Sequence, residues 1–253
     1  MPDRKLPQSV EACIVDLDGT LVDTLGDFEV ALNRMLAELQ LPPVARDFIG
    51  RAVGKGSEHL IRSVLAEQLR QADLSGGAIA ASSCPATRPE ARYPQAWRSY
   101  QTHYLAINGQ FSRVYPGVVA GLQALRALGL PLVCLTNKPL AFARPLLAAK
   151  GLDGFFSQVF GGDSFARQKP DPLPLIEACK ALGTPPARTL MVGDSSNDAA
   201  AARAAGCPVV LMRYGYNHGE PISGVDADGL ADALTEVADA LAAQRHNRVH
   251  KEA

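Results

Sequence analysis

The chain has 253 residues, of which 47% are hydrophobic and 20% are charged, as in a folded globular protein and unlike a disordered one. Its 25 basic and 26 acidic residues leave a net charge of −1, which excludes the basic excess that binding to nucleic acid or to an anionic membrane surface requires. Every apolar run is interrupted before it could span a bilayer, and the N-terminal segment carries no secretory signal pattern. These features predict a soluble cytoplasmic protein.

The five cysteines argue against a disulfide framework or a zinc ribbon, because their number is odd and none forms a CxxC pair. Three of them lie in or beside apolar runs, where a thiol usually acts as a small hydrophobic group: Cys13, Cys134 and Cys207. We therefore expect these three to be buried core residues.

Short, nearly continuous apolar runs recur along the chain, as expected for parallel strands covered on both faces. These runs cover residues 12–18, 131–137, 157–163, 189–194 and 207–212. Helical patterns that close on a glycine lie between the later runs, at residues 117–129, 139–151, 172–183 and 196–206. The alternation predicts an α/β fold with a doubly wound (Rossmann-like) parallel sheet.

The segment 24–112 breaks this alternation. It has helical patterns at 25–40 and 57–71 but no convincing strand, and its 89 residues are too many for a loop between a strand and a helix. We therefore expect a separate helical module inserted after the first strand, with residues 1–23 and 113–253 forming the α/β core.

Two further segments lack helical periodicity or apolar content. Residues 75–92 are rich in alanine, serine, proline and glycine, which predicts a flexible loop within the inserted module. Residues 244–253 form a mixed basic run, which predicts a fraying, solvated end of the chain.

The first predicted strand ends in Asp16-Leu17-Asp18-Gly19-Thr20, which places two carboxylates two residues apart on the same side of the chain. Both lie at the carboxyl end of the strand, the edge at which open α/β sheets bind ligands. Gly19 allows the backbone to approach a phosphate closely, and the N–H groups that follow it can form an anion-binding nest. On its own, an acidic pair at a strand end is also typical of an ordinary turn.

Polar side chains end the other predicted strands too. Thr136 and Asn137 follow the second strand and offer a hydroxyl and an amide to phosphoryl oxygens. Lys169 opens the loop before one of the later helices, and the fourth strand runs into a segment that contains Asp194 and Asp198. Each residue alone has an ordinary structural explanation, but four such loops at the junctions of one fold predict an active site.

These loops resemble the four motifs of the haloacid dehalogenase superfamily, specifically those of its phosphatases. The segment from Asp16 to Thr20 resembles the first motif, Thr136-Asn137 the second, Lys169 the third, and Asp194 with Asp198 the fourth. The helical insert resembles the mobile cap of that superfamily. The resemblance extends to bacterial phosphoglycolate phosphatases through residues 114–118, 135–139, 168–175, 191–206 and 214–221.

The resemblance implies that Asp16 is a nucleophile forming an aspartyl-phosphate, and that Asp18 is a general acid/base for the leaving alkoxide and then for water. It also implies a Mg²⁺ cofactor held by Asp16, the main-chain carbonyl of Asp18 and Asp194, because several anions need a counter-cation around a phosphate dianion. Lys169 would add a second positive charge. Asp198 either supports Asp194 or Lys169 from behind, or is an acid favoured at a helix start.

Substrate contacts outside the core motifs are less specified. In the glycine-rich segment 50–56, Arg51 or Lys55 either meets the carboxylate of a small acid such as glycolate when the cap closes, or belongs to a solvated loop. His218 has no serine or cysteine nucleophile near it in the sequence, so we expect a structural loop residue.

The sequence thus predicts a Mg²⁺-dependent phosphatase that hydrolyses 2-phosphoglycolate to glycolate and phosphate. The alternatives are a phosphatase or mutase of another small phosphorylated sugar or acid, and a catalytically silent binding module on the same fold. A dehalogenase would use the aspartate nucleophile without needing Asp18 as an acid, so the presence of Asp18 argues against that activity. The expected partner is a small phosphorylated metabolite, with neither nucleic acid nor membrane, and the expected assembly is a monomer or homodimer.

Overall fold

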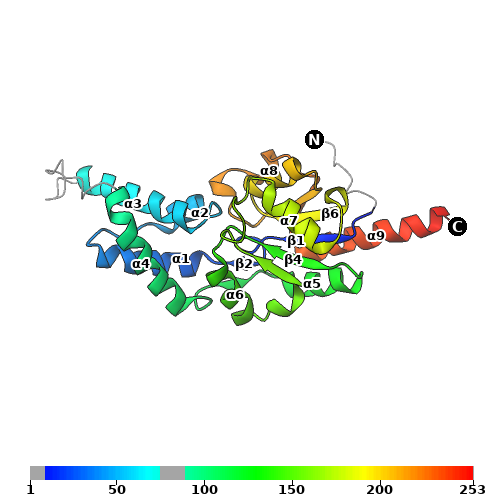
Figure 1. The fold of residues 1–253 in the computed structure, drawn as a ribbon, viewed down its shortest axis with the longest axis horizontal. Helices are drawn as coiled ribbons and strands as arrows, with labels where there is room; N and C mark the ends of the chain where they lie inside the picture. The colour runs from blue at the N-terminus through cyan, green and yellow to red at the C-terminus, as the bar shows by residue number, and fades with distance from the viewer. Residues whose placement is uncertain (1–8, 75–88, 253) are drawn as a thin grey trace.

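The computed structural model describes residues 9–74 and 89–252, and its centre is a six-stranded parallel sheet with the order β5-β4-β1-β6-β7-β8 (Figure 1). Its strands are β1 (Ala12–Val15), β4 (Leu132–Leu135), β5 (Gln158–Phe160), β6 (Thr189–Gly193), β7 (Val209–Met212) and β8 (Gly229–Ala231). The predicted doubly wound α/β fold is confirmed. The expected strands are present, each shorter than its apolar run, and β8 at the sheet edge is an addition.

Helices cover both faces of this sheet (Figure 1). On one face lie α5 (Val118–Ala127), α6 (Leu140–Ala149) and α9 (Leu234–Glu252), and on the other α7 (Leu173–Leu182) and α8 (Ser196–Ala205). Adjacent side chains of a strand point to opposite faces, so Cys13 and Val15 join the first core and Ile14 joins the second. Short 3₁₀ helices connect these elements: η2 (Asp153–Phe155), η3 (Pro186–Arg188), η4 (Asn217–Gly219) and η5 (Ile222–Gly224).

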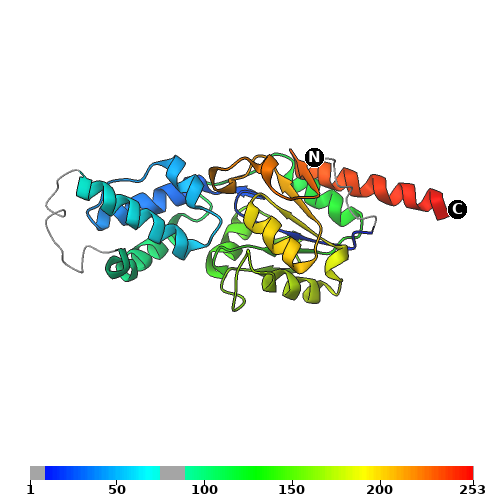
Figure 2. The same cartoon turned by 90° about the horizontal axis from the view of Figure 1, so that it is seen from above.

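A second group of helices forms a separate module at one end of the molecule, away from the sheet (Figure 2). It consists of α1 (Leu25–Glu38), α2 (Arg46–Ala52), α3 (Ser57–Leu74) and α4 (Pro89–Ile107). Its core is built around fully buried side chains such as Leu32, Ile61 and Tyr100, and Phe142 of α6 packs into it from the sheet domain. We call these four helices the cap.

Two short strands connect the cap to the sheet domain. β2 (Val22–Asp23) enters the cap, β3 (Arg113–Val114) leaves it, and the two pair antiparallel. The buried carboxylate of Asp27 fixes this junction, because it accepts the N–H of Gly109 at 2.9 Å and that of Phe111 at 2.7 Å. The two points at which the chain enters and leaves the cap are therefore held together.

Two segments differ from the sequence-based expectation. α4 begins at Pro89, so residues 89–92 of the predicted loop are helical, and residues 75–88 lie outside the described residues. The predicted fraying end is instead part of α9, and the Arg245 guanidinium donates to the carbonyls of Leu128 and Val10. None of the helices in the described residues is long and apolar enough to cross a bilayer.

The cysteines lie where their apolar neighbours predict. Cys13, Cys134 and Cys207 are buried, free thiols in the two cores of the sheet domain. Cys179 on α7 is also free and buried, with its Sγ atom 3.8 Å from that of Cys207. Cys84 lies outside the described residues.

Candidate active site

The carboxyl ends of β1, β4 and β6 bring the predicted motif residues together at one edge of the sheet. Asp16 follows β1 directly, and Asp194 follows β6, its neighbour in the sheet. Thr136 and Asn137 follow β4 on the other side of β1. Parallel pairing places all three strand ends side by side, which is why residues far apart in the chain meet here.

A buried lysine links two of the carboxylates. The Lys169 ammonium is 3.0 Å from Asp16 Oδ2 and 2.7 Å from Asp198 Oδ1, and it also donates to the Leu135 carbonyl at 3.0 Å. With these three acceptors, all N–H groups of the ammonium are used. Asp198 therefore orients Lys169 toward Asp16.

The opposing charges shift the ionisation of these groups. Burial raises the pKa of Asp16 to about 7, against the opposing effect of the Lys169 charge. Burial alone would lower the pKa of Lys169, but the carboxylates of Asp16 and Asp198 outweigh it and raise that pKa. For Asp198, burial opposes ionisation, and the Lys169 charge outweighs it and lowers the pKa. Lys169 and Asp198 thus form a stable ion pair beside a carboxylate that titrates near neutrality.

Asp194 has the least compensated charge of the group. Burial, together with the nearby charges of Asp198 and Asp16, raises its pKa well above the usual value. Its oxygens accept only uncharged donors: the Thr20 hydroxyl at 2.9 Å and the Tyr216 N–H at 2.8 Å. Within residues 9–74 and 89–252, no basic side chain pairs with Asp194. A bound cation would compensate the charge of its carboxylate.

The carboxylates fit a hard divalent cation. Oxygens of Asp16, Asp194 and Asp198 all lie within 4.8 Å of one another. Of these, Asp198 is already occupied, because one oxygen accepts from Lys169 and the other from the N–H and hydroxyl of Ser195 and the N–H of Asp194. Asp16 and Asp194 therefore remain as the side-chain oxygens available to Mg²⁺, which prefers such ligands.

Two glycines allow the backbone to pass close to Asp194. Gly19 has a φ of +82°, and a Cβ atom there would overlap the Asp194 carboxylate. A Cβ atom on Gly215, which precedes Tyr216, would overlap the same carboxylate. The glycine of the first motif is thus required by a neighbouring carboxylate, a reason that its sequence context does not reveal.

The two residues after β4 play different parts. Thr136 is buried, and its hydroxyl accepts the N–H of Lys138 at 3.2 Å, which leaves the hydroxyl proton available as a donor. The Asn137 amide donates to the carbonyls of Lys169 and Gly54 at 2.8 and 3.0 Å, and its oxygen accepts the Lys169 N–H at 3.0 Å. In this structure the Asn137 side chain therefore joins the lysine loop to the cap.

The cap is closed over the carboxylates. The Gly54 carbonyl accepts from the amide of Asn137 and from that of Asn197, the latter at 3.2 Å, and the Lys55 carbonyl accepts from Gln168 at 3.1 Å. Beneath this loop lies a small cavity of about 20 Å³. It is lined by core residues and by cap residues, namely Asp16, Asp18, Thr136, Asn137 and Lys138 with Phe28, Val53, Gly54, Gly56, Ser57 and Leu60.

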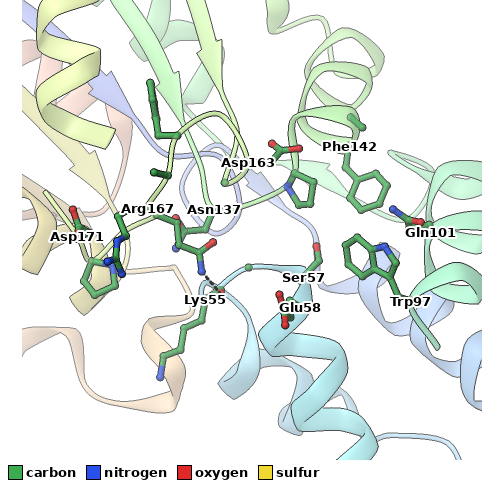
Figure 3. A pocket seen from close by; sticks show the side chains of 18 residues that line it. Lys55, Ser57, Glu58, Trp97, Gln101, Asn137, Phe142, Asp163, Arg167 and Asp171 are labelled. Carbon is green, nitrogen blue, oxygen red and sulfur yellow. Dashed lines mark hydrogen bonds between the residues drawn. The ribbon is translucent and has the colours of Figure 1, made fainter. Parts of the chain in front are cut away.

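A larger cleft of about 820 Å³ lies beside this cavity, between the cap helices α3 and α4 and the sheet domain (Figure 3). Gly56, Ser57 and Asn137 line both spaces. Figure 3 shows Trp97 and Phe142 on one side of the cleft and the Lys55 side chain directed away from them. The cleft therefore adjoins the cavity through the three shared residues.

The structure does not bring the two candidate cap cations into the cavity. Lys55 lines the outer cleft, and Arg51 is exposed, with its side chain packed against Gly219. His218 has a φ of +56° and is half-buried, and its ring packs close to Gly54 of the cap loop. A structural role for His218 stays a prediction.

Lys138 and Tyr216 are site residues to which sequence reasoning gave no part. Lys138 follows Asn137 directly, and its ammonium contacts both oxygens of Asp18 at 2.8 and 3.1 Å. The Tyr216 hydroxyl donates to Asp23 at 2.9 Å and accepts the Thr24 N–H at 2.7 Å, while its own N–H holds Asp194. Adjacency to the second motif was the one available signal for Lys138.

Known proteins share much of this sequence. The chain is 41% identical over 235 residues to a phosphoglycolate phosphatase from Thiobacillus denitrificans, which covers 93% of this chain and 97% of that protein. It is 43% identical over 223 residues to a plasmid-borne phosphoglycolate phosphatase from Cupriavidus necator, with 88% and 89% covered.

A solved structure with the same fold is described as a predicted phosphoglycolate phosphatase from Haemophilus somnus. It has a TM-score of 0.83 and 32% sequence identity, and the match covers 92% of this chain and 98% of that one. A family model for haloacid dehalogenase-like hydrolases matches residues 10–206, which include the cap and all four motif loops. The chain therefore belongs to the haloacid dehalogenase-like hydrolase family and is an enzyme of that family.

Proposed function

We propose that this enzyme is a Mg²⁺-dependent phosphatase that hydrolyses 2-phosphoglycolate to glycolate and phosphate. The observation that carries the proposal is the small cavity of about 20 Å³ lined by Asp16, Asp18 and Lys138, the one cation among the described residues that line it. A cavity of this size has room for about one water molecule, so only a small substrate could be enclosed after a modest opening of the cap. The names of the relatives at 41% and 43% identity support the same substrate.

In the first step, an Asp16 oxygen attacks phosphorus, the Asp16–phosphorus bond forms and the ester bond to glycolate breaks. Asp18 gives its proton to the departing alkoxide oxygen, so that glycolate leaves with a hydroxyl group. In the second step, a water oxygen attacks phosphorus and the bond to Asp16 breaks. The ionised Asp18 takes the proton of that water, and both carboxyl groups return to their starting states.

Lys169 and Asp194 set the charge around these steps. Lys169, held by Asp198, keeps its positive charge beside Asp16 and stabilises negative charge on the transferred oxygens. Asp16, Asp194 and the main-chain carbonyl of Asp18 would hold the Mg²⁺ ion, which supplies a counter-charge for the phosphate. Thr136 would donate its hydroxyl proton to a phosphoryl oxygen.

Arg51 and Lys55 enter the proposal differently. Neither lines the small cavity, so in this structure neither is placed to contact a glycolate carboxylate held there. Lys55, at the outer cleft, would meet the anionic substrate on its way in.

The test is a comparison of phosphate release from 2-phosphoglycolate, small sugar phosphates and an aryl phosphate, each with Mg²⁺ and with excess chelator. We expect kcat/KM for phosphoglycolate to exceed that of the sugar phosphates by at least about tenfold, and chelator to remove activity on every ester. A preference for a sugar phosphate would contradict the proposed substrate but not the proposed reaction steps. No release from any ester would point to a silent binding module.

Mg²⁺ binding should depend on pH in a direction that burial determines. Because burial raises the pKa of Asp16 from 3.8 to about 7, the folded apo protein binds a proton there that the unfolded chain has lost. Its stability therefore falls as the pH rises between these two values, and the raised pKa of Asp194 acts in the same direction. Since Mg²⁺ needs both carboxylates ionised, its stabilising effect should grow over the same range.

Thermal unfolding with and without Mg²⁺, followed from about pH 5 to about pH 8, measures this effect. The increase in unfolding temperature on adding Mg²⁺ should be small at the acid end and largest at the alkaline end. Asp194→Asn is the matched control and should lose most of the increase at every pH. An increase that is the same at all pH values would contradict the assignment of these carboxylates.

A further inference from the structure

Lys138 is the only cation among the described residues that line the closed cavity, and its contacts come from both parts of the molecule. Its Nζ atom lies 2.8 Å from Asp18 Oδ1 and 3.1 Å from Oδ2, and its side chain is 1% exposed. On its other side, the same Nζ atom lies 4.3 Å from the ring centre of Phe28 and 4.8 Å from that of Tyr104. Asp18 belongs to the sheet domain, whereas Phe28 and Tyr104 belong to cap helices α1 and α4.

The two rings form a rigid wall for the ammonium. Phe28 and Tyr104 stack with their ring centres 5.6 Å apart, and Tyr104 packs on Tyr100 at 5.4 Å and on Phe142 at 4.9 Å. A desolvated ammonium over aromatic faces gains cation–π attraction, and a flexible lysine side chain loses its freedom only where such partners hold it. The closed cap therefore determines where the Lys138 ammonium lies.

The other lysine of the site offers an informative contrast. Lys169 contacts Asp16, Asp198 and the Leu135 carbonyl, all of which belong to the sheet domain. Its position beside Asp16 does not depend on the cap. The surroundings of the Lys138–Asp18 pair do, because Phe28 and Tyr104 of the cap helices cover the ammonium.

We infer that Lys138 is a positioning residue for Asp18, and that cap closure engages it through Phe28 and Tyr104. The inference rests on the proposed acid/base function of Asp18. When the cap is closed, the ammonium donates to both Asp18 oxygens and so fixes the orientation of this carboxyl group relative to the leaving oxygen of the ester. When the cap opens, Asp18 loses this constraint, which confines efficient proton transfer to the closed enzyme.

Three substrates distinguish this role from others when kcat/KM is compared, since that parameter includes departure of the leaving group but not the later hydrolysis. Phosphoglycolate has a poor leaving group and a carboxylate, ethyl phosphate has a poor leaving group alone, and p-nitrophenyl phosphate has a good leaving group that needs no proton. We expect Lys138→Met to lower kcat/KM by about 10²-fold on both poor leaving groups and by less than about threefold on p-nitrophenyl phosphate. Lys180→Met, at an exposed lysine of α7, is the matched control and should show no such pattern.

The rings are tested through Phe28→Leu, which keeps Lys138 and an apolar side chain. Its expected effect is a loss of about fivefold with the same dependence on the leaving group. In combination with Lys138→Met it should add nothing further, because both changes remove one interaction. If Lys138→Met does not fold, Phe28→Leu alone carries the test, with circular dichroism and Mg²⁺ binding as checks of the fold.

Three outcomes would overturn the inference. A loss confined to phosphoglycolate would make Lys138 a contact for the substrate carboxylate. An equal loss on all three esters would assign it to phosphate binding or folding, and no loss would leave it without a part in the reaction. Failure of the proposed substrate is a separate result, because wild-type activity on ethyl phosphate and p-nitrophenyl phosphate suffices to test Lys138.

Discussion

Asp16→Asn should reduce phosphate release by at least about 10⁴-fold under saturating Mg²⁺ while the protein remains folded. The amide keeps the shape of the carboxylate but lacks the nucleophilic oxygen. The fold survives because Lys169 still has Asp198 and the Leu135 carbonyl as partners. Since burial raises the pKa of Asp16 to about 7, the substitution also removes a charge that the apo protein holds at a cost near neutral pH.

Two further measurements make this prediction specific to the nucleophile. Wild-type enzyme quenched in acid during turnover should carry a phosphoryl group on the peptide that contains Asp16, and Asp16→Asn should carry none, as mass spectrometry would show. Asp153→Asn, an exposed aspartate of η2, is the matched control and should retain activity. Turnover by a folded Asp16→Asn protein within about tenfold of wild type would contradict covalent catalysis through this residue.

The effect of Asp18→Asn on activity should differ from that of Asp16→Asn in its nature as well as in its size. We expect kcat/KM for phosphoglycolate to fall by about 10²–10⁴-fold, because the amide cannot donate the proton that the alkoxide needs. Mg²⁺ binding should largely persist, since Asp18 would give the metal only its main-chain carbonyl. The amide that replaces the Asp18 carboxylate would keep an oxygen as acceptor for Lys138, so the buried ammonium retains a partner.

Comparing substrates with different leaving groups again distinguishes an acid/base role of Asp18 from a role as a metal ligand. The loss should be much smaller on p-nitrophenyl phosphate, and Lys138→Met should reproduce this pattern at reduced size. Calorimetric titration with Mg²⁺ is the accompanying control. If loss of Mg²⁺ affinity were the main defect of Asp18→Asn, the side chain would be a metal ligand and the proposed division of roles between Asp16 and Asp18 would be wrong.

Local patterns were sufficient for five strands and four helices of the sheet domain, but not for β8 and α9. Apolar runs bounded by glycine-closed helices predict the parallel strands, and Gly183 and Gly206 indeed end α7 and α8 in the left-handed conformation. The carboxyl ends of parallel strands always meet at one edge, so the polar residues after β1, β4 and β6 could be predicted to converge. The helix α4 was not predicted, because Pro89, Pro94 and the loop-like composition before them obscure its periodicity.

The sequence by itself determined the fold class and the residue types that converge at the sheet edge, since strand alternation and motif spacing are local properties. Only the tertiary structure decided which groups touch: Lys138 meets Asp18 across 120 residues and Asp194 meets Thr20 across 174. It also excluded Arg51 and Lys55 from the closed cavity. No local pattern encodes such pairings, because they depend on how distant strand ends and the cap come together in space.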